Sequence, residues 1–167
     1  LSCIDLLDVY QTNEGQQIDI SMLDCQIALM ENAVVRYSVT DNMPMPMGGR
    51  HPSLVPFQAF KAQDGYFTVA IANERLFKSL CKVLNIENLL EDVRFATNTE
   101  RVSNHGALET MLNKIFESNK KEHWINVLDD AGIPCGPINN VGDLFQSPHV
   151  KARNMLIEME HYLAGKV

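Results

Sequence analysis

The first 40 residues combine turn chemistry with helical spacing of apolar side chains. Apolar residues three apart, ending at Tyr10, predict an opening helix, and Gln17–Ile20 alternates as a short strand does. A second helix is predicted from residue 22 to about residue 39, capped by Ser21, because apolar side chains recur there at three- and four-residue steps. These side chains are Leu23, Ile27, Met30, Val34 and Tyr37.

A β-hairpin is predicted in the middle of the chain. Residues 55–60 and 66–71 are apolar segments that flank a connection at residues 61–65. The connection ends in Asp64-Gly65, a pair typical of tight hairpin turns. We therefore expect two antiparallel strands here.

Three helices with one apolar face each should follow the hairpin. Asn73 is placed to cap the first, while Asn119–Glu122 resembles a capping box for the third, which should end at Gly132. A short helix should start at Ser147-Pro148, before a strand pattern at residues 156–161. The three apolar faces consist of Leu76, Phe77, Leu80, Cys81 and Leu84, then Leu108, Met111, Leu112, Ile115 and Phe116, and finally Trp124, Val127 and Leu128.

Two segments rich in proline and glycine interrupt these elements. Met43–Pro52 contains three prolines and two adjacent glycines, so no helix or inner strand can pass through it. We expect a loop and a domain boundary there. Residues 133–138 should form a rigid, extended loop, because Pro134 and Pro137 each fix φ, and the isomer of either proline bond stays open.

Composition narrows the chain to an ordinary folded protein. Of its 167 residues 46% are hydrophobic and 21% charged, and no apolar run reaches the roughly 20 residues that a membrane helix needs. The net charge of −7 disfavours attraction to nucleic acid or to an anionic membrane. We expect a soluble protein of the cytoplasm, or of mitochondria in a eukaryote, that binds neither partner.

The residues that commonly hold metals or perform redox chemistry are scattered. The cysteines form no C-x-x-C pair, and the histidines outside residue 51 have no ligand spacing. We therefore predict free thiols, a structural role for Cys135, and neither a metal site nor a bound cofactor. The residues concerned are Cys3, Cys25, Cys81 and Cys135, with His105, His123, His149 and His161.

Several blocks of residues resemble the family III CoA-transferases, which include formyl-CoA and succinyl-CoA transferases. Glu14–Met22 has the family pattern G-x-x-hydrophobic-D-hydrophobic-S-M. Further blocks follow in family order at family-like separations, so the resemblance covers nearly the whole chain. They are Gly48–Ser53, Pro56–Phe60 with Asp64-Gly65, Arg94–Asn98 with Arg101, Trp124, Ala131–Pro137 and Pro148–Arg153.

The resemblance implies an α/β fold in two parts. In this family a Rossmann-like large domain and a smaller α/β domain, with a β-hairpin and several helices, are joined by linkers, and two subunits interlock as a homodimer. Residues 1–45 would belong to the large domain and linker, and residues 46–145 to the small α/β domain. Residues 146–167 would return toward the large domain. Both ends of the sequence accordingly read as cut from a longer chain.

The resemblance also implies the chemistry. Such enzymes transfer CoA from an acyl-CoA thioester to a carboxylic acid. This sequence most resembles the succinyl-CoA-dependent members, which implies a dicarboxylate as the acceptor. An aspartate attacks the thioester and forms a mixed anhydride and then an aspartyl-CoA thioester. By the family spacing this aspartate precedes Leu1, so no catalytic residue is assigned here. Asp5 and Asp8 are expected to be surface residues, and the fragment alone should be inactive.

Five residues are candidates for substrate binding. Gly48 and Gly49 match the family's glycine-rich loop over the acyl site, where backbone N–H groups can meet an oxyanion. Arg50 and His51 follow directly and suit an acceptor carboxylate. Met22 matches a methionine near the thiol end of CoA. Each candidate also has an ordinary alternative role. Gly48 and Gly49 could form a flexible turn, Arg50 could be a surface side chain, His51 could simply precede a proline, and Met22 could pack within a helix.

Two other functions stay open. A 2-methylacyl-CoA racemase has the same fold but moves a proton with a histidine–aspartate pair. A non-catalytic fragment that binds CoA or a protein partner would also fit a chain without the attacking aspartate. An aspartate encoded upstream in the same reading frame would favour an enzyme.

Overall fold

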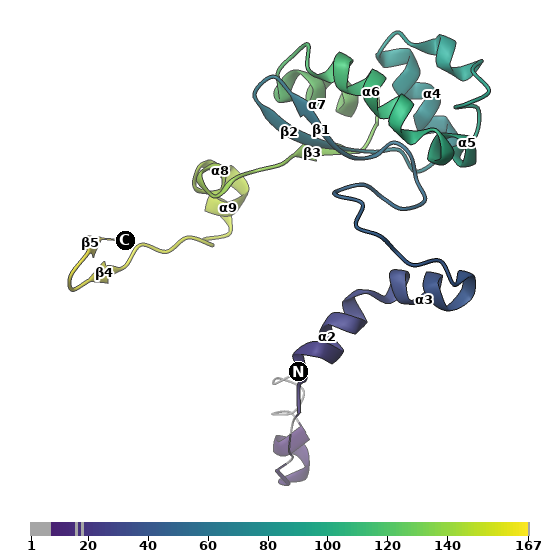
Figure 1. The fold of residues 1–167 in the computed structure, drawn as a ribbon. Coiled ribbons are helices and arrows are strands. Elements are labelled where there is room, and N and C mark those ends of the chain that lie inside the picture. Colours follow the sequence, from purple (N-terminus) through teal and green to yellow (C-terminus); the bar gives the residue numbers. More distant parts are fainter. Residues whose placement is uncertain (1–7, 16, 18, 167) are drawn as a thin grey trace. The chain divides into compact units, whose positions relative to one another are not determined.

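The computed structural model describes residues 8–15, 17 and 19–166 (Figure 1). The chain divides into two compact units, Leu1–Pro46 and Met47–Val167. We describe each unit by itself. The assignment of residues 1–45, 46–145 and 146–167 to parts of a larger enzyme stays a prediction.

The first unit is helical. Residues 8–12 are helical, and the start of the predicted opening helix lies outside the described residues. Residues 17, 19 and 20 form no strand, so the strand predicted there is wrong for these positions, while Ile18 lies outside the described residues. Asp19 is exposed, and an isolated four-residue strand has no partner with which to pair its backbone.

The single helix predicted over residues 22–39 is two helices. Ser21 caps α2 (Met22–Leu29) as predicted, its side chain accepting a hydrogen bond from N of Asp24. Met30 then departs from helical geometry at φ −92° and ψ 17°, and α3 (Glu31–Thr40) begins directly after it. The apolar spacing continues across this one residue, so the pattern of side chains could not reveal the break.

The second unit is built on a three-stranded antiparallel sheet. Strands β1 (Phe57–Ala62) and β2 (Gly65–Ala70) form the predicted hairpin, with Phe60 opposite Phe67. Strand β3 (Cys135–Pro137) pairs with β2, giving the order β1-β2-β3. The segment predicted as an extended loop therefore contains a strand, which the prolines permit because β3 is an edge strand. Within the described residues the cis peptide bond is Val55–Pro56, not a bond to Pro134 or Pro137.

Helices pack on this sheet and complete its core. Helix α6 (His105–Phe116) packs on β1, and α7 (Lys121–Asp130) packs on β2 and β3 (Figure 1). Phe116 of α6 lies at the centre, with ring centroids 5.0 Å from Phe60, 5.1 Å from Phe67 and 5.3 Å from Trp124. The remaining elements of this part are α4 (Glu74–Val83), η1 (Glu87–Leu90) and α5 (Asn98–Ser103).

The start of α4 agrees with the sequence, whereas the start of α7 does not. Asn73 caps α4 by accepting a hydrogen bond from N of Leu76. Lys120 rather than Asn119 is the N-cap residue of α7, and its side chain makes no capping bond, so the predicted capping box is wrong. The cap comes instead from the hairpin turn, where Oδ1 of Asp64 accepts a hydrogen bond from N of Lys121 at 2.8 Å. Gly132, with φ 68°, follows the helix as predicted.

Short elements make up the C-terminal part of this unit. Helix α8 (Val141–Gln146) has a capping box, and α9 (Pro148–Ala152) has the predicted Ser147 cap and proline start. Strands β4 (Glu160–His161) and β5 (Gly165–Lys166) pair antiparallel, the first of them inside the predicted strand segment. None of the described helices combines the length and apolar character that crossing a membrane would require.

Candidate functional site

The predicted glycine pair opens the second unit's first loop. Gly48 has φ 66°, a left-handed conformation that side-chain-bearing residues rarely adopt. A Cβ added at Gly49 would meet no atom within 4 Å, so local crowding does not require glycine there. Among the described residues neither glycine donates a backbone hydrogen bond. Both N–H groups are therefore available to a ligand or to water.

His51 is held firmly by its own loop. Its backbone N–H donates to O of Phe57 at 2.8 Å, and its ring stacks on the Phe57 ring with centroids 5.1 Å apart. Nδ1 accepts the backbone N–H groups of Ser53 and Leu54, each at 3.1 Å. These two donors assign the ring proton to Nε2 by the hydrogen-bond network. Nε2 has no partner within the described residues.

Asn98 anchors the backbone just beyond His51. Its Nδ2 donates to O of Ser53 at 2.7 Å, and its Oδ1 accepts from N of Val55 at 3.1 Å. The Asn98 N–H in turn donates to Oε1 of Glu74 at 3.1 Å. The start of α5 therefore fixes the end of the loop through both atoms of one amide.

Arg101 completes this anchor from inside the protein. Its side chain is 1% exposed, and its Nη1 and Nη2 bind the Glu74 carboxylate at 2.9 Å and 2.8 Å. Nε donates to O of Val55 at 2.9 Å, Nη1 also donates to O of Phe95, and the guanidinium lies 4.1 Å from the Phe77 ring centroid. The hydrogen bond from Arg101 lowers the pKa of Glu74, so this carboxylate stays ionised at neutral pH.

Arg50 presents a charge that the fold does not use. Its side chain is half-buried, and within the described residues it makes no ion pair and no hydrogen bond. Arg94, by contrast, binds Asp92 with Nη2 to Oδ2 at 2.7 Å. Arg50 is therefore available to an external anion.

Met22 begins α2 and is 85% exposed. Helix α2 has no buried residue, so Met22 does not pack inside the described part of the chain. It belongs to the first unit, whereas Gly48–His51 belong to the second. Contact of Met22 with CoA stays a prediction.

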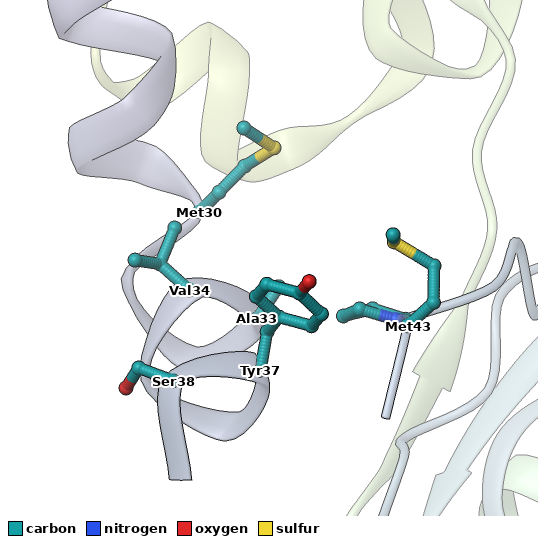
Figure 2. A pocket seen from close by; sticks show the side chains of 7 residues that line it. Met30, Ala33, Val34, Tyr37, Ser38 and Met43 are labelled. Atoms are coloured by element: carbon teal, nitrogen blue, oxygen red, sulfur yellow. The ribbon is translucent and has the colours of Figure 1, made fainter. Parts of the chain in front are cut away.

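An apolar hollow of about 380 Å³ lies on the first unit, along α3 (Figure 2). Its wall includes Met30, Val34 and Tyr37 on one side and Met43 and Pro44 from the following segment. The polar residues in its lining are Tyr37 and Ser38. It has no charged group with which to hold a carboxylate or a phosphate.

Two thiols of the second unit, Cys81 and Cys135, lie in or beside its core. Burial raises the pKa of Cys81 to about 11 and also raises that of Cys135, whose Sγ lies 3.5 Å from O of Ile125. This contact supports the structural role predicted for Cys135. No group of three or more His, Cys, Asp or Glu side chains in the described part of the chain could hold a metal ion.

Sequence reasoning missed the anchor formed by Glu74, Asn98 and Arg101. Two signals could have found it: an arginine in a helix beside apolar Val102, and an asparagine directly after Thr97, the N-cap residue of α5. A buried arginine needs a carboxylate and carbonyl groups to satisfy its five donors. Glu74, at a distant helix start, cannot be identified as that carboxylate from spacing alone.

The chain belongs to CoA-transferase family III, whose sequence model matches residues 3–167. It is 38% identical over 148 residues to an acetyl-CoA:oxalate CoA-transferase of Acetobacter aceti, covering 89% of this chain and 38% of that enzyme. It is 34% identical over 162 residues to the succinyl-CoA:glutarate CoA-transferase of Homo sapiens, covering 97% of this chain and 37% of that enzyme. The chain thus spans less than half the length of these curated relatives.

Solved structures agree on the fold. A CAIB/BAIF family protein from Brucella suis matches with a TM-score of 0.76 and 33% identity, over 97% of this chain and 46% of that one. The Rv3272 protein of M. tuberculosis matches with a TM-score of 0.77 at 19% identity, over 99% of this chain and 43% of that one. The predicted family and its fold are therefore confirmed.

Proposed function

We propose that this chain is part of an enzyme that transfers CoA from an acyl-CoA thioester to a dicarboxylic acid. One observation carries the proposal: in a chain of this family, the N–H groups of Gly48 and Gly49 and the Arg50 guanidinium have no partner within the described residues, while the downstream end of their loop is anchored. The relatives named above act on oxalate and glutarate, which favours a dicarboxylate as acceptor. Family resemblance further favours an interlocked homodimer in the cytoplasm, or in the mitochondria of a eukaryote.

The proposed reaction proceeds through an aspartate outside this chain. Its carboxylate attacks the thioester carbonyl and expels CoA thiolate, giving a mixed anhydride. The thiolate attacks the aspartyl carbonyl and releases the donor acid, leaving an aspartyl-CoA thioester. The acceptor carboxylate then attacks the aspartyl-CoA thioester and expels CoA thiolate, giving a second mixed anhydride. The thiolate attacks the acceptor's carbonyl in this anhydride, which forms the new thioester and frees the aspartate. No electron is gained or lost, so the reaction needs no cofactor besides the CoA thioester itself.

The candidate residues of the loop and Met22 of α2 have distinct parts in this proposal. Each attack places negative charge on a carbonyl oxygen, which the N–H groups of Gly48 and Gly49 would stabilise. Arg50 would neutralise the acceptor carboxylate, to which a guanidinium can donate two hydrogen bonds. Met22 would lie against the thiol end of CoA. His51 keeps its Nε2–H without a partner within the described residues, because the backbone bonds engage only Nδ1.

The test uses the full-length transferase that carries this segment. Incubation with succinyl-CoA or acetyl-CoA and ¹³C-labelled glutarate or oxalate should give a labelled new thioester, detected by mass spectrometry. The 167-residue chain alone should give none. Exchange of the α-proton of a 2-methylacyl-CoA in D₂O, without any new thioester, would instead establish the racemase alternative. Neither reaction in the full-length protein would favour a non-catalytic role.

Arg50→Ala should separate acceptor binding from the rest of the reaction. Removing a charge-assisted hydrogen bond costs about 1.5–3 kcal/mol, which corresponds to a rise in KM for the dicarboxylate of about 10- to 150-fold. The KM for acyl-CoA should change far less. Arg75→Ala is the matched control, because Arg75 is also an arginine of the second unit but is exposed. Equal effects of the two substitutions would contradict the role of Arg50.

A further inference from the structure

The His51 ring has a fixed donor and a fixed acceptor end. Nδ1 accepts two backbone N–H groups, from Ser53 and Leu54, so it cannot carry a proton without losing both. The ring is therefore neutral, with its proton on Nε2. The two bonds to Nδ1 set which ring nitrogen faces the turn, and stacking on Phe57 holds the plane of the ring.

We infer that His51 is a neutral hydrogen-bond donor, through Nε2–H, to a carboxylate oxygen of the acceptor acid. This inference rests on the proposed function. A carboxylate has two oxygens and accepts several hydrogen bonds. Arg50 directly precedes His51 and has no partner in the described part of the chain. It supplies the charge, while His51 supplies a donor of fixed direction.

The same hydrogen bonds exclude His51 as a proton-transferring base. A base needs an unprotonated nitrogen facing the substrate, and here the unprotonated nitrogen is occupied by the main chain. Acting as a base would require the ring to exchange its tautomer and to break the turn over residues 51–54. His51 thus fits a reaction that binds carboxylates and not one that removes a carbon-bound proton.

Two substitutions separate the ends of the ring in the full-length enzyme. Asparagine places an oxygen near the position of Nδ1, where it can accept the Ser53 and Leu54 N–H groups as in an Asx turn, but it has no donor at Nε2. Glutamine places an amide N–H near Nε2 but no acceptor near Nδ1. His51→Asn therefore keeps the turn and loses the donor, and His51→Gln does the reverse.

The two variants should have opposite effects on the melting temperature and on the KM for the acid. His51→Asn should keep the melting temperature within about 2 °C of the wild type while raising the KM for glutarate or oxalate by about 10-fold or more, as expected for a lost bond to a charged group. The KM for acyl-CoA should stay within about twofold, since the donor serves the acid. His51→Gln should lower the melting temperature and keep the dicarboxylate KM closer to the wild type. Wild-type kinetics in His51→Asn would overturn the inference and leave His51 as a turn cap.

His161 provides a matched control in the same chain. Its Nδ1 also accepts two backbone N–H groups, from Leu163 at 3.3 Å and Ala164 at 3.2 Å, in the β4–β5 hairpin. His161→Asn makes the same chemical change at a second capping histidine. It should leave both KM values unchanged, and a loss equal to that of His51→Asn would show that the substitution acts through the fold.

A spectroscopic measurement distinguishes this inference from the proposed function. In ¹⁵N NMR at neutral pH, His51 should show a proton on Nε2 and an unprotonated Nδ1, and a proton on Nδ1 would overturn the assignment. Wild-type enzyme that forms no thioester with either acid would contradict the proposed function, and with it the acceptor contact. The tautomer and the exclusion of a base role are decided by the NMR result alone.

Discussion

Arg101 connects three segments of the second unit that are distant in the sequence. It binds the Glu74 carboxylate at the start of α4, O of Val55 before β1, and O of Phe95 ahead of α5. Its charge is buried, and Glu74 offsets that charge from a side chain that is 51% exposed. Because one partner remains in contact with water, the desolvation cost is borne mainly by the arginine.

The pair makes stability depend on pH in acid. The pKa of Glu74 is lowered in the folded state, so its contribution is fully present above the ordinary value of 4.5 and is lost as the pH falls through the folded value. Glu74→Gln should destabilise the chain by about 1–2 kcal/mol at pH 7. The difference from the wild type should shrink between pH 4.5 and pH 3.

Urea unfolding of the chain, followed by the fluorescence of Trp124, measures this difference. Trp124 is the single tryptophan of the sequence and is 7% exposed, so its emission reports unfolding of the core. A gap between the two proteins that stays constant from pH 7 to pH 3 would show that Glu74 ionisation does not stabilise the fold.

Single residues were predicted where the signal is local. The caps at Ser21, Asn73 and Ser147 follow from short sequence patterns. The capping of residues 53 and 54 by the His51 ring does not, because it depends on the path of the backbone after a proline. The candidate site was therefore found by resemblance, while its geometry required the structure.

At the scale of elements, the hairpin turn also organises a helix. Asp64 lies in the turn between β1 and β2 and caps α7 from 57 positions away, while N of Gln63 donates to O of Asn119. The capping pattern at Asn119–Glu122 is genuine as a pattern but is not used. A tertiary acceptor has taken the place of the local one.

Asp64→Ala should destabilise the chain by about 1 kcal/mol, the usual cost of losing an N-cap side chain. Asp64→Asn is the control, since its amide oxygen can still accept the Lys121 N–H and it changes only the charge. The same urea unfolding experiment compares the three proteins. If the alanine variant were as stable as the asparagine variant, the long-range cap would have no energetic role.

Strong periodicity predicted the existence of most elements but not all their bounds. The hairpin, α4, α6 and α7 were predicted because each carries several apolar side chains at one spacing. Helices α5 and α8 were missed, since six residues are too few to establish a period. Strand β3 was taken for a loop because proline content outweighed its short extended run.

At the scale of the whole molecule, the buried apolar residues among those that the structure describes lie between Val55 and Ile133. Helices α2 and α3 have no buried residue, and many of their apolar side chains are exposed, including Leu29 at 78% and Val39 at 78%. Apolar surface of this kind is normally covered by another segment or another chain. The sequence alone predicted these faces as apolar but could not say what covers them.

Amide hydrogen exchange in the isolated chain should be slow in the second unit's core and fast in α2 and α3. Amides of the β1–β2 hairpin, α6 and α7 should exchange slowly, whereas those of α2 and α3 should exchange close to the rate of an unfolded chain, because they lack buried contacts. In the full-length protein α2 and α3 should become protected. Slow exchange of α2 and α3 in the 167-residue chain would show that they are stable without any covering segment.

The loop before β1 is held at its downstream end. The Asn98 amide bonds residues 53 and 55 to α5, and the His51 ring stacks on Phe57, whereas a Cβ added at either of the two glycines upstream would meet no atom within 4 Å. If the proposed enzyme closes over a bound thioester, the backbone would turn at the glycines, ahead of residue 51. The His51 imidazole would keep its position beside Phe57 of β1, and it would orient the incoming acid.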